Sequence, residues 1–443
     1  MVKLRHEVRD CLYGFIEFNN FEKQLIDSAP FQRLRHIHQL AMCYQVYPSA
    51  THKRFEHSLG VMEIATRIFD SLFRDRLADS VQERIEEELT DERKKYWRNI
   101  IRIGALLHDI GHLPFSHAAE EALLPAGWNH ERLTAEMIRH SGISEILRGN
   151  IPPLNVEDVV AVAWDFEKRS KVEPDIALDP WRTLLNEIIC GNTFGADRID
   201  YLLRDSRHLG VAYGNFDPYR LISGLRVLVD NSNDLIAIGM DIGAIHAAEA
   251  LLLARYFMYT QVYFHDVRRV YDLHLREFLE HWLPGGKFPS NWTELLAYTD
   301  NEVLAALHKA AQEPNNELYN LAKRLVSRGH FRTVYELVST HKQKRPTILD
   351  DLRKLAEEQF GAERIRFDRY GPKTEANNFP VLLEDGGQES SLRVSGVIAQ
   401  IPRVEFGLIF AAPDVKNSAK KMIDREVKTV SDGPNVATEE SRR

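Results

Sequence analysis

Three short stretches of the chain gather histidines, carboxylates and arginines, the side chains that bind metals and phosphates. They run from His52 to Gly60 (HKRFEHSLG), from Ala105 to His117 (ALLHDIGHLPFSH) and from Asn192 to Asp205 (NTFGADRIDYLLRD). In the middle stretch a His-Asp pair closes an apolar run, where burying polar groups without partners is costly. A divalent cation would satisfy this pair by binding one imidazole nitrogen and one carboxylate oxygen.

The surroundings of this pair favour a metal site over a chance dipeptide. Three histidines, His108, His112 and His117, crowd one short turn. His57 belongs to an expected amphipathic helix, and Asp197 opens another. Two imidazoles and two carboxylates would suit Mn, Fe, Zn or Mg, with water completing the coordination shell.

Phosphate groups also need cations, and the helical spacing supplies them near the same residues. Arg54 precedes His57 by three residues, so both project from one helix face. Asp197, Tyr201 and Arg204 are spaced i, i+4, i+7 and form one stripe, which we expect to face the same site. The alternative interpretation is a core tyrosine at 201 and an ion pair on the helix surface at 204.

The elements that must position these residues are mostly helices. Apolar residues recur at three- and four-residue intervals over 55–72, which predicts an amphipathic helix. Residues 100–107 are almost wholly apolar and predict a buried helix. Asn129 can cap a helix that begins at His130, and two further helices are expected over 184–190 and 198–204.

Composition bounds the class of protein. A chain of 443 residues exceeds the usual size of one hydrophobic core, so we expect a main domain and a smaller module. The net charge of −8 argues against a general nucleic-acid coat protein, without excluding a locally basic pocket. Three scattered cysteines fit a reducing cytoplasm and exclude a disulfide framework. We expect neither a secretory signal nor a membrane span, because charged and polar residues interrupt the apolar stretch 242–264.

The fold class predicted is mainly α, with a small α+β module in the C-terminal part. LRVLVD and LIAIGM flank the turn sequence NSND and predict a hairpin, and long helices are expected over 243–279. ERIRFDRY, FPVLLED, SGVIAQI and VEFGLIF are short strand-like runs beyond residue 360. We therefore expect a catalytic core with an N-terminal segment over 1–225, a helical extension completing the substrate pocket over 226–355, the α+β module over 356–420 and a flexible tail over 421–443.

The motifs, taken together and in order, resemble the HD-domain superfamily, whose signature is H…HD…D. The segments that carry the resemblance are FQRLRHIHQL, FEHSLG, HDIGHLPFSH and the pattern D-[KR]-x-D-Y-x-x-R-D-x-x-H-L-G, which runs from Asp197 to Gly210. The sequence is most similar to deoxynucleoside triphosphate triphosphohydrolases, including the animal enzymes that join a sterile-alpha-motif to an HD domain, from about His6 to Tyr219. The resemblance implies a helical HD core.

The resemblance also implies roles for individual residues. It makes His57, His108, Asp109 and Asp197 the ligands of one divalent metal ion, for which Mn, Fe, Zn, Mg, Co and Ni stay open, and Mg can accompany the substrate triphosphate. It places the catalytic histidines His112, His117 and His130 around the α-phosphate. A bound metal polarises a phosphoryl oxygen and activates water, and a neighbouring imidazole can protonate the leaving oxygen. Hydrogen bonding without proton transfer is the alternative for these histidines.

Further residues match the family's nucleotide contacts. The resemblance implies substrate binding by Gln39, Arg54, Arg198, Tyr201, Asp205, Arg255, Tyr263 and His265. It implies a guanine-nucleotide regulatory site at Asp27, Gln32 and Arg35, for which a helix cap plus an ion pair is the alternative. The family's second regulatory pocket has a K-V-x-N run where this chain has His6, Glu7 and Arg9, so we expect weak effector binding and modest activation.

Three hypotheses of function stand at this point. The leading one is metal-dependent hydrolysis of a deoxynucleoside triphosphate to deoxynucleoside and inorganic triphosphate, by a cytoplasmic homo-oligomer (a dimer or tetramer). The second is another HD-type phosphohydrolase: a nucleotidase, a cyclic-nucleotide phosphodiesterase or a single-strand nuclease. The third is a nucleotide-sensing regulatory protein without turnover, which would not require the three accessory histidines.

Overall fold

The computed structural model describes residues 5–75, 77–116, 120–173, 180–230, 234–371 and 378–432. The chain forms two compact units. The first comprises Met1–Met258, Lys287–Val303 and Glu375–Pro402, and the second comprises Tyr259–Gly286, Leu304–Thr374 and Arg403–Arg443. The boundaries expected at 225, 355 and 420 do not coincide with this division, because the chain returns to the first unit twice.

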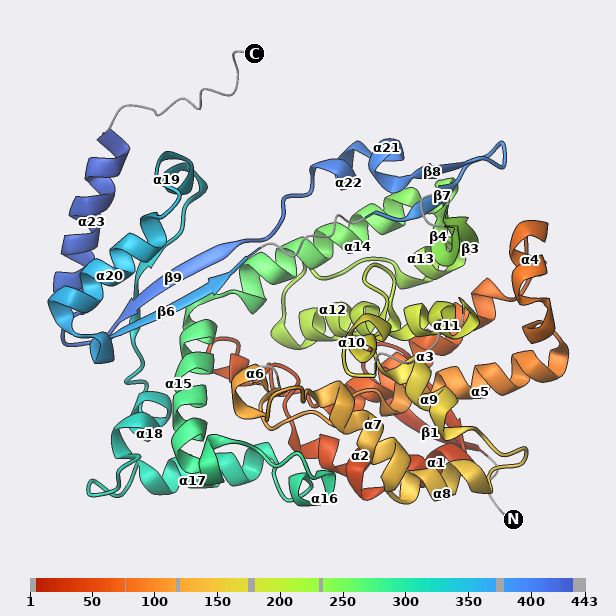
Figure 1. Cartoon of the computed structure of the whole chain (residues 1–443), viewed down its shortest axis with the longest axis horizontal. Helices are drawn as coiled ribbons and strands as arrows, with labels where there is room; N and C mark the ends of the chain where they lie inside the picture. The colour runs from red at the N-terminus through yellow and green to blue at the C-terminus, as the bar shows by residue number, and fades with distance from the viewer. Residues whose placement is uncertain are drawn as a thin grey trace. The chain divides into compact units, whose positions relative to one another are not determined.

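Three long helices form the centre of the first unit (Figure 1). Helix α3 (Arg54–Leu72) packs against α5 (Asp91–Leu107) and α12 (Ala196–Leu209). The apolar stripe expected on α3 is buried, and the second half of α5 is buried on all sides. Helices α9 (Val156–Ala163) and α11 (Pro180–Cys190) pack beside α5 and each other. The helices predicted over 55–72, 100–107, 184–190 and 198–204 are confirmed, and α9 was not predicted.

Shorter elements surround this centre. They are α1 (Asn20–Ile26), α2 (Ala29–Arg33), α4 (Asp79–Ile85), α6 (Glu120–Leu123), α7 (His130–His140), α8 (Gly142–Gly149), α10 (Phe166–Ser170), α13 (Pro218–Gly224), α14 (Ile245–Met258), α16 (Trp292–Leu295), α21 (Ser391–Val394) and α22 (Gly396–Gln400). Helix α17 (Asp300–Ala310) begins in the first unit. The side chain of Asn129 accepts from the amide of Arg132, so the predicted cap of α7 is confirmed.

Two small sheets belong to the first unit. Strands β1 (Arg5–Asp10) and β2 (Gly14–Asn19) form an antiparallel hairpin. The second sheet has the order β3-β4-β7-β8, in which β3 (Leu225–Asp230) and β4 (Leu235–Asp241) are the predicted hairpin. Strand β7 (Pro380–Leu382) joins β4 in parallel and pairs with β8 (Gln388–Ser390). The run SGVIAQI, predicted as a strand, instead forms α22, because the Ser395 side chain caps it by accepting from the amide of Ile398.

The second unit packs helices on a three-stranded antiparallel sheet. Its strands have the order β5 (Arg332–Glu336), β9 (Phe406–Ala411) and β6 (Ile365–Tyr370), and its helices are α15 (Asp266–Trp282), α18 (Tyr319–Val326), α19 (Ser339–Lys344), α20 (Ile348–Phe360) and α23 (Lys416–Asp432). Ala419 and Ile423 of α23 are buried in the core of this unit. Residues 421–432, which the sequence assigned to a flexible tail, therefore belong to an amphipathic helix.

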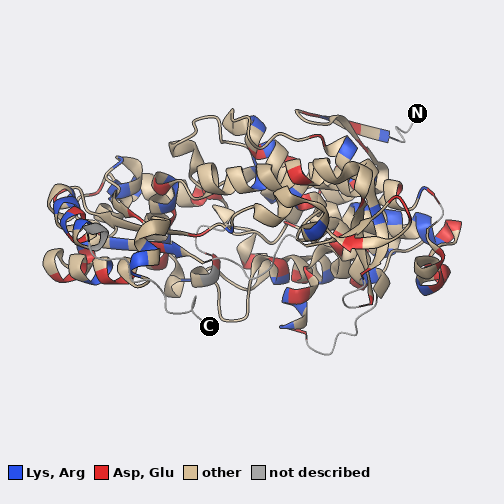
Figure 2. Cartoon of the chain, turned by 90° about the horizontal axis from the view of Figure 1, so that it is seen from above, with Lys and Arg blue, Asp and Glu red and all other residues tan. Residues whose placement is uncertain are grey.

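The predicted fold class, mainly α with a small α+β module, is confirmed. Lys and Arg are interspersed with Asp and Glu along the described helices (Figure 2), as the modest net charge of −8 suggests. Of the helices that the structure describes, none is long and apolar enough to cross a bilayer.

Candidate active site

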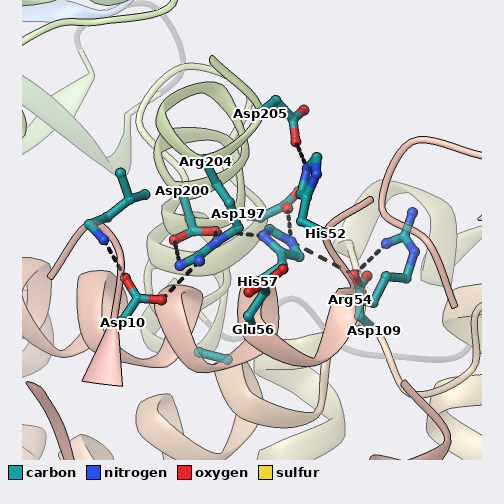
Figure 3. A network of polar contacts seen from close by, with 12 residues as sticks. Asp10, His52, Arg54, Glu56, His57, Asp109, Asp197, Asp200, Arg204 and Asp205 are labelled. Atoms are coloured by element: carbon teal, nitrogen blue, oxygen red, sulfur yellow. Dashed lines mark hydrogen bonds and ion pairs between the residues drawn. The ribbon is translucent and has the colours of Figure 1, made fainter. Parts of the chain in front are cut away.

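The helices of the first unit bring the four predicted metal ligands together, and Figure 3 shows three of them, His57, Asp109 and Asp197. His57 lies on the first turn of α3, His108 and Asp109 follow the last residue of α5, and Asp197 lies on the first turn of α12. Nε2 of His57 is 3.0 Å from Oδ1 of Asp197 and 3.7 Å from Oδ2 of Asp109. Ligand atoms of His57, His108 and Asp197 all lie within 4.8 Å of one another.

The donor set fits a divalent cation. Nδ1 of His108 donates to the carbonyl of Ala105 over 2.7 Å, which leaves the lone pair on Nε2. This Nε2 is buried and has no hydrogen-bond partner among the residues that the structure describes. A buried nitrogen without a partner carries a desolvation penalty of about 1–3 kcal/mol. A cation at this point would remove that penalty and use the imidazole and carboxylate ligands that divalent metals accept.

The charges of the site are strongly coupled. Burial alone would lower the pKa of His57, but its hydrogen bonds to Asp197 and Asp200 outweigh burial and raise the pKa to about 10. Burial would raise the pKa of Asp109, yet Arg54, His108 and His112 hold it well below its usual range. The carboxylates are therefore ionised, and the proton on His57 is the charge that a bound cation would replace.

A second group of side chains lies against the first. Asp109, His112 and His130 also offer ligand atoms within 4.8 Å of one another. Oδ1 of Asp109 is 3.2 Å from Nε2 of His112, and the rings of His112 and His130 stack with centroids 3.9 Å apart. Nδ1 of His130 donates to Oε1 of Glu120 over 2.7 Å. His117 lies outside the residues that the structure describes.

The two stacked histidines differ in their affinity for a proton. Burial, Arg54 and the neighbouring His130 all lower the pKa of His112 well below its usual value. Burial also opposes protonation of His130, but the Glu120 carboxylate outweighs it and raises the pKa of His130. Groups whose surroundings separate their pKa values in this way are suited to different acid and base roles. His130 is the better proton donor of the two.

Arg54 is buried and held beside Asp109 by two contacts. Its Nη1 donates to Oδ2 of Asp109, and its Nε donates to Oγ of Ser116 over 2.7 Å. The Ser116 hydroxyl in turn donates to the carbonyl of His38 over 2.8 Å. The amide of Phe115 donates to Oδ1 of Asp300 over 2.7 Å, which ties this turn to the start of α17. The Arg54 guanidinium is therefore held in one orientation beside Asp109, at the candidate metal site.

The other predicted nucleotide contacts of the first unit are spread around the site. Gln39 is buried, and its Oε1 has no hydrogen-bond partner within the described part of the chain. Asp205 is buried and accepts from Nε2 of His52 over 2.7 Å. Nη1 of Arg198 lies 3.5 Å from the carbonyl of Gly191. Tyr201 is half-buried on α12, and Nη1 of Arg255 donates to the carbonyl of Asn192 over 3.1 Å.

One sequence expectation for α12 is wrong. Arg204 does not face the phosphate site with Asp197 and Tyr201. It is fully buried, and its guanidinium donates to both oxygens of Asp200 and to Oδ2 of Asp10. The direction of its side chain is set by these two carboxylates, one of which lies on the N-terminal hairpin.

The remaining predicted residues stay predictions. Tyr263 and His265 belong to the second unit, at the end of a π-helical turn and at the N-terminal cap of α15. Nε of Arg35 donates to Oε1 of Gln32 over 2.9 Å, and the Arg35 guanidinium lies 3.5 Å from the centre of the Phe55 ring. Asp27 instead pairs with Lys23.

Sequence reasoning missed four residues that support the site, namely His52, Glu120, Asp200 and Asp300. Asp200 could have been found, because it follows Asp197 by three residues and so lies one helical turn away. The pairings of the other three do not follow from helical spacing. Glu120 pairs with His130, ten residues further on, while the partners of His52 and Asp300 are 153 and 185 residues away.

Comparisons with known proteins identify the family. The model of the HD domain matches residues 54–203, and that of the HD associated region matches residues 216–364. A hypothetical protein from Aquifex aeolicus, whose crystal structure is known, is 32% identical, with a TM-score of 0.76 over 94% of this chain and 99% of that one. The chain therefore belongs to the HD-domain family of phosphohydrolases.

Two curated relatives extend the comparison. An uncharacterized protein of Methanocaldococcus jannaschii is 36% identical over 60% of this chain and 47% of its own length. The human deoxynucleoside triphosphate triphosphohydrolase SAMHD1 is 28% identical over 90% of this chain and 63% of its own length. The chain spans about half the length of the curated relatives it matches.

Proposed function

We propose that the protein hydrolyses deoxynucleoside triphosphates to deoxynucleoside and inorganic triphosphate at a divalent metal held by His57, His108, Asp109 and Asp197. The observation that carries the proposal is the convergence of these side chains on the buried Nε2 of His108, which lies 3.4 Å from Oδ1 of Asp109 and 3.7 Å from Oδ1 of Asp197 without a hydrogen bond. Similarity to the human triphosphohydrolase supports the choice of substrate.

In this mechanism each side chain has a separate task. The metal, when bound, polarises the α-phosphoryl oxygen and lowers the pKa of a water molecule to about 7. Arg54 brings its positive charge to the phosphate from its fixed place beside Asp109. Nε2 of His130 holds the proton for the leaving 5′-oxygen, because Glu120 accepts from Nδ1 and stabilises the imidazolium. His112, kept neutral, can accept the proton that the attacking water loses.

The sugar, the effector and the assembly complete the proposal. The buried Oε1 of Gln39 can accept from a sugar hydroxyl. Asp205, Tyr201 and Arg198 would contact the nucleotide along α12, and Arg255, Tyr263 and His265 are proposed as further substrate contacts on the motif resemblance alone. We place the protein in the cytoplasm as a homo-oligomer that binds a guanine nucleotide weakly at Asp27, Gln32 and Arg35.

A turnover panel tests the function. The purified protein is incubated with each dNTP, NTP, nucleoside monophosphate, cyclic nucleotide and short oligonucleotide in the presence of Mg, Mn, Fe or Co, and the products are separated by anion exchange. Intact triphosphate should form from dNTPs, and Asp109→Ala should release none. Stepwise phosphate release through diphosphate would indicate a nucleotidase, and products from cyclic nucleotides or oligonucleotides alone would indicate the other HD activities.

A further inference from the structure

A buried carboxylate behind His57 accepts hydrogen bonds on both of its oxygens. Oδ2 of Asp200 accepts from Nδ1 of His57 over 2.7 Å and from Nε of Arg204 over 2.8 Å. Oδ1 accepts from the hydroxyl of Tyr13 over 2.8 Å and from Nη2 of Arg204 over 3.0 Å. With Nδ1 of His57 donating to Asp200, Nε2 lies 3.0 Å from Oδ1 of Asp197 and 3.7 Å from Oδ2 of Asp109, on the metal side of the ring.

The N-terminal hairpin fixes this carboxylate from the other side. Tyr13 lies in the turn between β1 and β2, and Oδ1 of Asp10 accepts from the amides of Leu12 and Tyr13 over 2.8 and 3.0 Å. Oδ2 of Asp10 accepts from Nη1 of Arg204 over 2.8 Å (Figure 3). The turn is therefore bonded to α12 at two points, through Arg204 and through Asp200.

Space for the carboxylate comes from a glycine on α3. Gly60 follows His57 by three residues, on the same face of the helix. A Cβ atom at Gly60 would lie 2.0 Å from Oδ1 of Asp200 and 2.4 Å from Nη2 of Arg204. Any other residue at this position would displace the group that holds His57.

Stability alone gives a poor account of this network. Burying Asp10, Asp200 and Arg204 removes three charges from water, and well-packed apolar residues of similar volume are often as stable or more so. What the network provides and apolar packing cannot is a fixed acceptor for Nδ1 of His57. Metal-binding histidines need such an acceptor to set the tautomer and the direction of the ring.

We propose that Asp200 is a positioning residue for the metal ligand His57, and that Tyr13, in the hairpin turn, positions Asp200 in turn. The proposal rests on the proposed role of His57 as a ligand. The chain contains a matched control: the buried Asp158 accepts from the hydroxyl of Tyr96 over 2.6 Å and from Nε of Arg182 over 2.9 Å, with no histidine among the hydrogen-bond partners that the structure describes.

The test compares metal binding with stability. Wild-type protein, Asp200→Asn, Tyr13→Phe and the controls Asp158→Asn and Tyr96→Phe are freed of metal by chelation. Each is titrated with Co²⁺ by calorimetry, its visible absorption spectrum is recorded, and its unfolding temperature is measured. Asp200→Asn should weaken Co²⁺ binding about 10- to 100-fold and alter the spectrum. Tyr13→Phe should weaken binding by less, within about tenfold. The controls should lose stability and keep the wild-type affinity.

The outcomes separate the two proposals. Wild-type affinity and spectrum in both Asp200→Asn and Tyr13→Phe, with only a lower unfolding temperature, would overturn the positioning role and leave the metal site intact. A wild-type protein that binds no Co²⁺ would refute the metal site itself, and the positioning role with it. If Asp200→Asn does not fold, Tyr13→Phe decides the question, because it removes one hydroxyl and leaves the hydrogen bonds from Arg204 and His57.

Discussion

A methyl group added at Gly60 should force apart the buried pair of Asp200 and Arg204 and thereby disturb His57. In Gly60→Ala the new Cβ would lie 2.0 Å from Oδ1 of Asp200, whereas ordinary contacts begin at 3.4 Å. Both neighbours are fully buried, so neither can move aside into solvent. The carboxylate must shift by more than a hydrogen bond tolerates.

The size of the effect can be worked out from three contributions. Overpacking a buried site costs about 1–3 kcal/mol. Separating a buried ion pair costs about 3–5 kcal/mol. Replacing glycine by alanine inside a helix by itself stabilises the helix by about 1 kcal/mol, which offsets part of this loss. The free energy of unfolding of Gly60→Ala should therefore fall by about 3 kcal/mol or more, and Co²⁺ binding should weaken with it.

Urea unfolding followed by circular dichroism measures the loss, and Co²⁺ titration of the folded variant measures the effect on the site. Gly149→Ala is the matched control, since Gly149 is also helical and a Cβ there meets nothing within 4 Å. The control should stay within about 1 kcal/mol of wild type. A Gly60→Ala protein as stable as that control would show that the Asp200–Arg204 pair is not held against α3.

His108→Ala should abolish metal binding and activity without changing the helical circular dichroism signal, because apolar side chains hold α5; full activity in a metal-free variant would refute the ligand assignment. Burial raises the pKa of Glu187 from 4.5 to about 7. The folded state thus prefers the protonated carboxyl, and the stability this gives is complete below about pH 4.5 and is lost, by at most about 3 kcal/mol, as the pH rises to 7. Glu187→Gln should remove that decline in the unfolding temperature; an unchanged decline would contradict it. Added GTP should modestly raise activity on a non-guanine dNTP, and Arg35→Ala should remove the increase; the regulatory assignment fails if GTP changes neither the rate nor the mass measured by light scattering.

Local spacing predicted the helices well and the directions of their polar side chains less well. The apolar periodicity of 55–72 and the run 100–107 located α3 and α5, because burying one face or all faces of a helix leaves a regular pattern in the sequence. The same logic placed Arg204 with Asp197 and Tyr201. The side chain of Arg204 instead bonds to two carboxylates: Asp200, one turn earlier on the same helix, and Asp10, which is 194 residues away. A helical wheel includes the first partner and cannot include the second.

Assembly of the four candidate ligands required more than spacing. The residues alone singled out His108-Asp109 and added His57 and Asp197 as further candidates, and the motif resemblance made these four the ligand set. The structure brings all four together from three helices. The run SGVIAQI shows the opposite case: its short apolar stretch predicted a strand, but the Ser395 side chain caps a short helix there.

The turn after the His-Asp pair shows why part of the candidate site cannot be predicted from the sequence. Phe115 and Ser116 both adopt left-handed backbone conformations, with φ of 57° and 58°, each of which costs on the order of 1–3 kcal/mol. The strain persists because the side chain of Asp300, 185 residues further on, accepts a hydrogen bond from the amide of Phe115. In this conformation Oγ of Ser116 accepts a hydrogen bond from Nε of Arg54, which keeps the guanidinium beside Asp109. A carboxylate outside the HD motifs thus helps to fix the Arg54 guanidinium, which we propose as the cation for the phosphate.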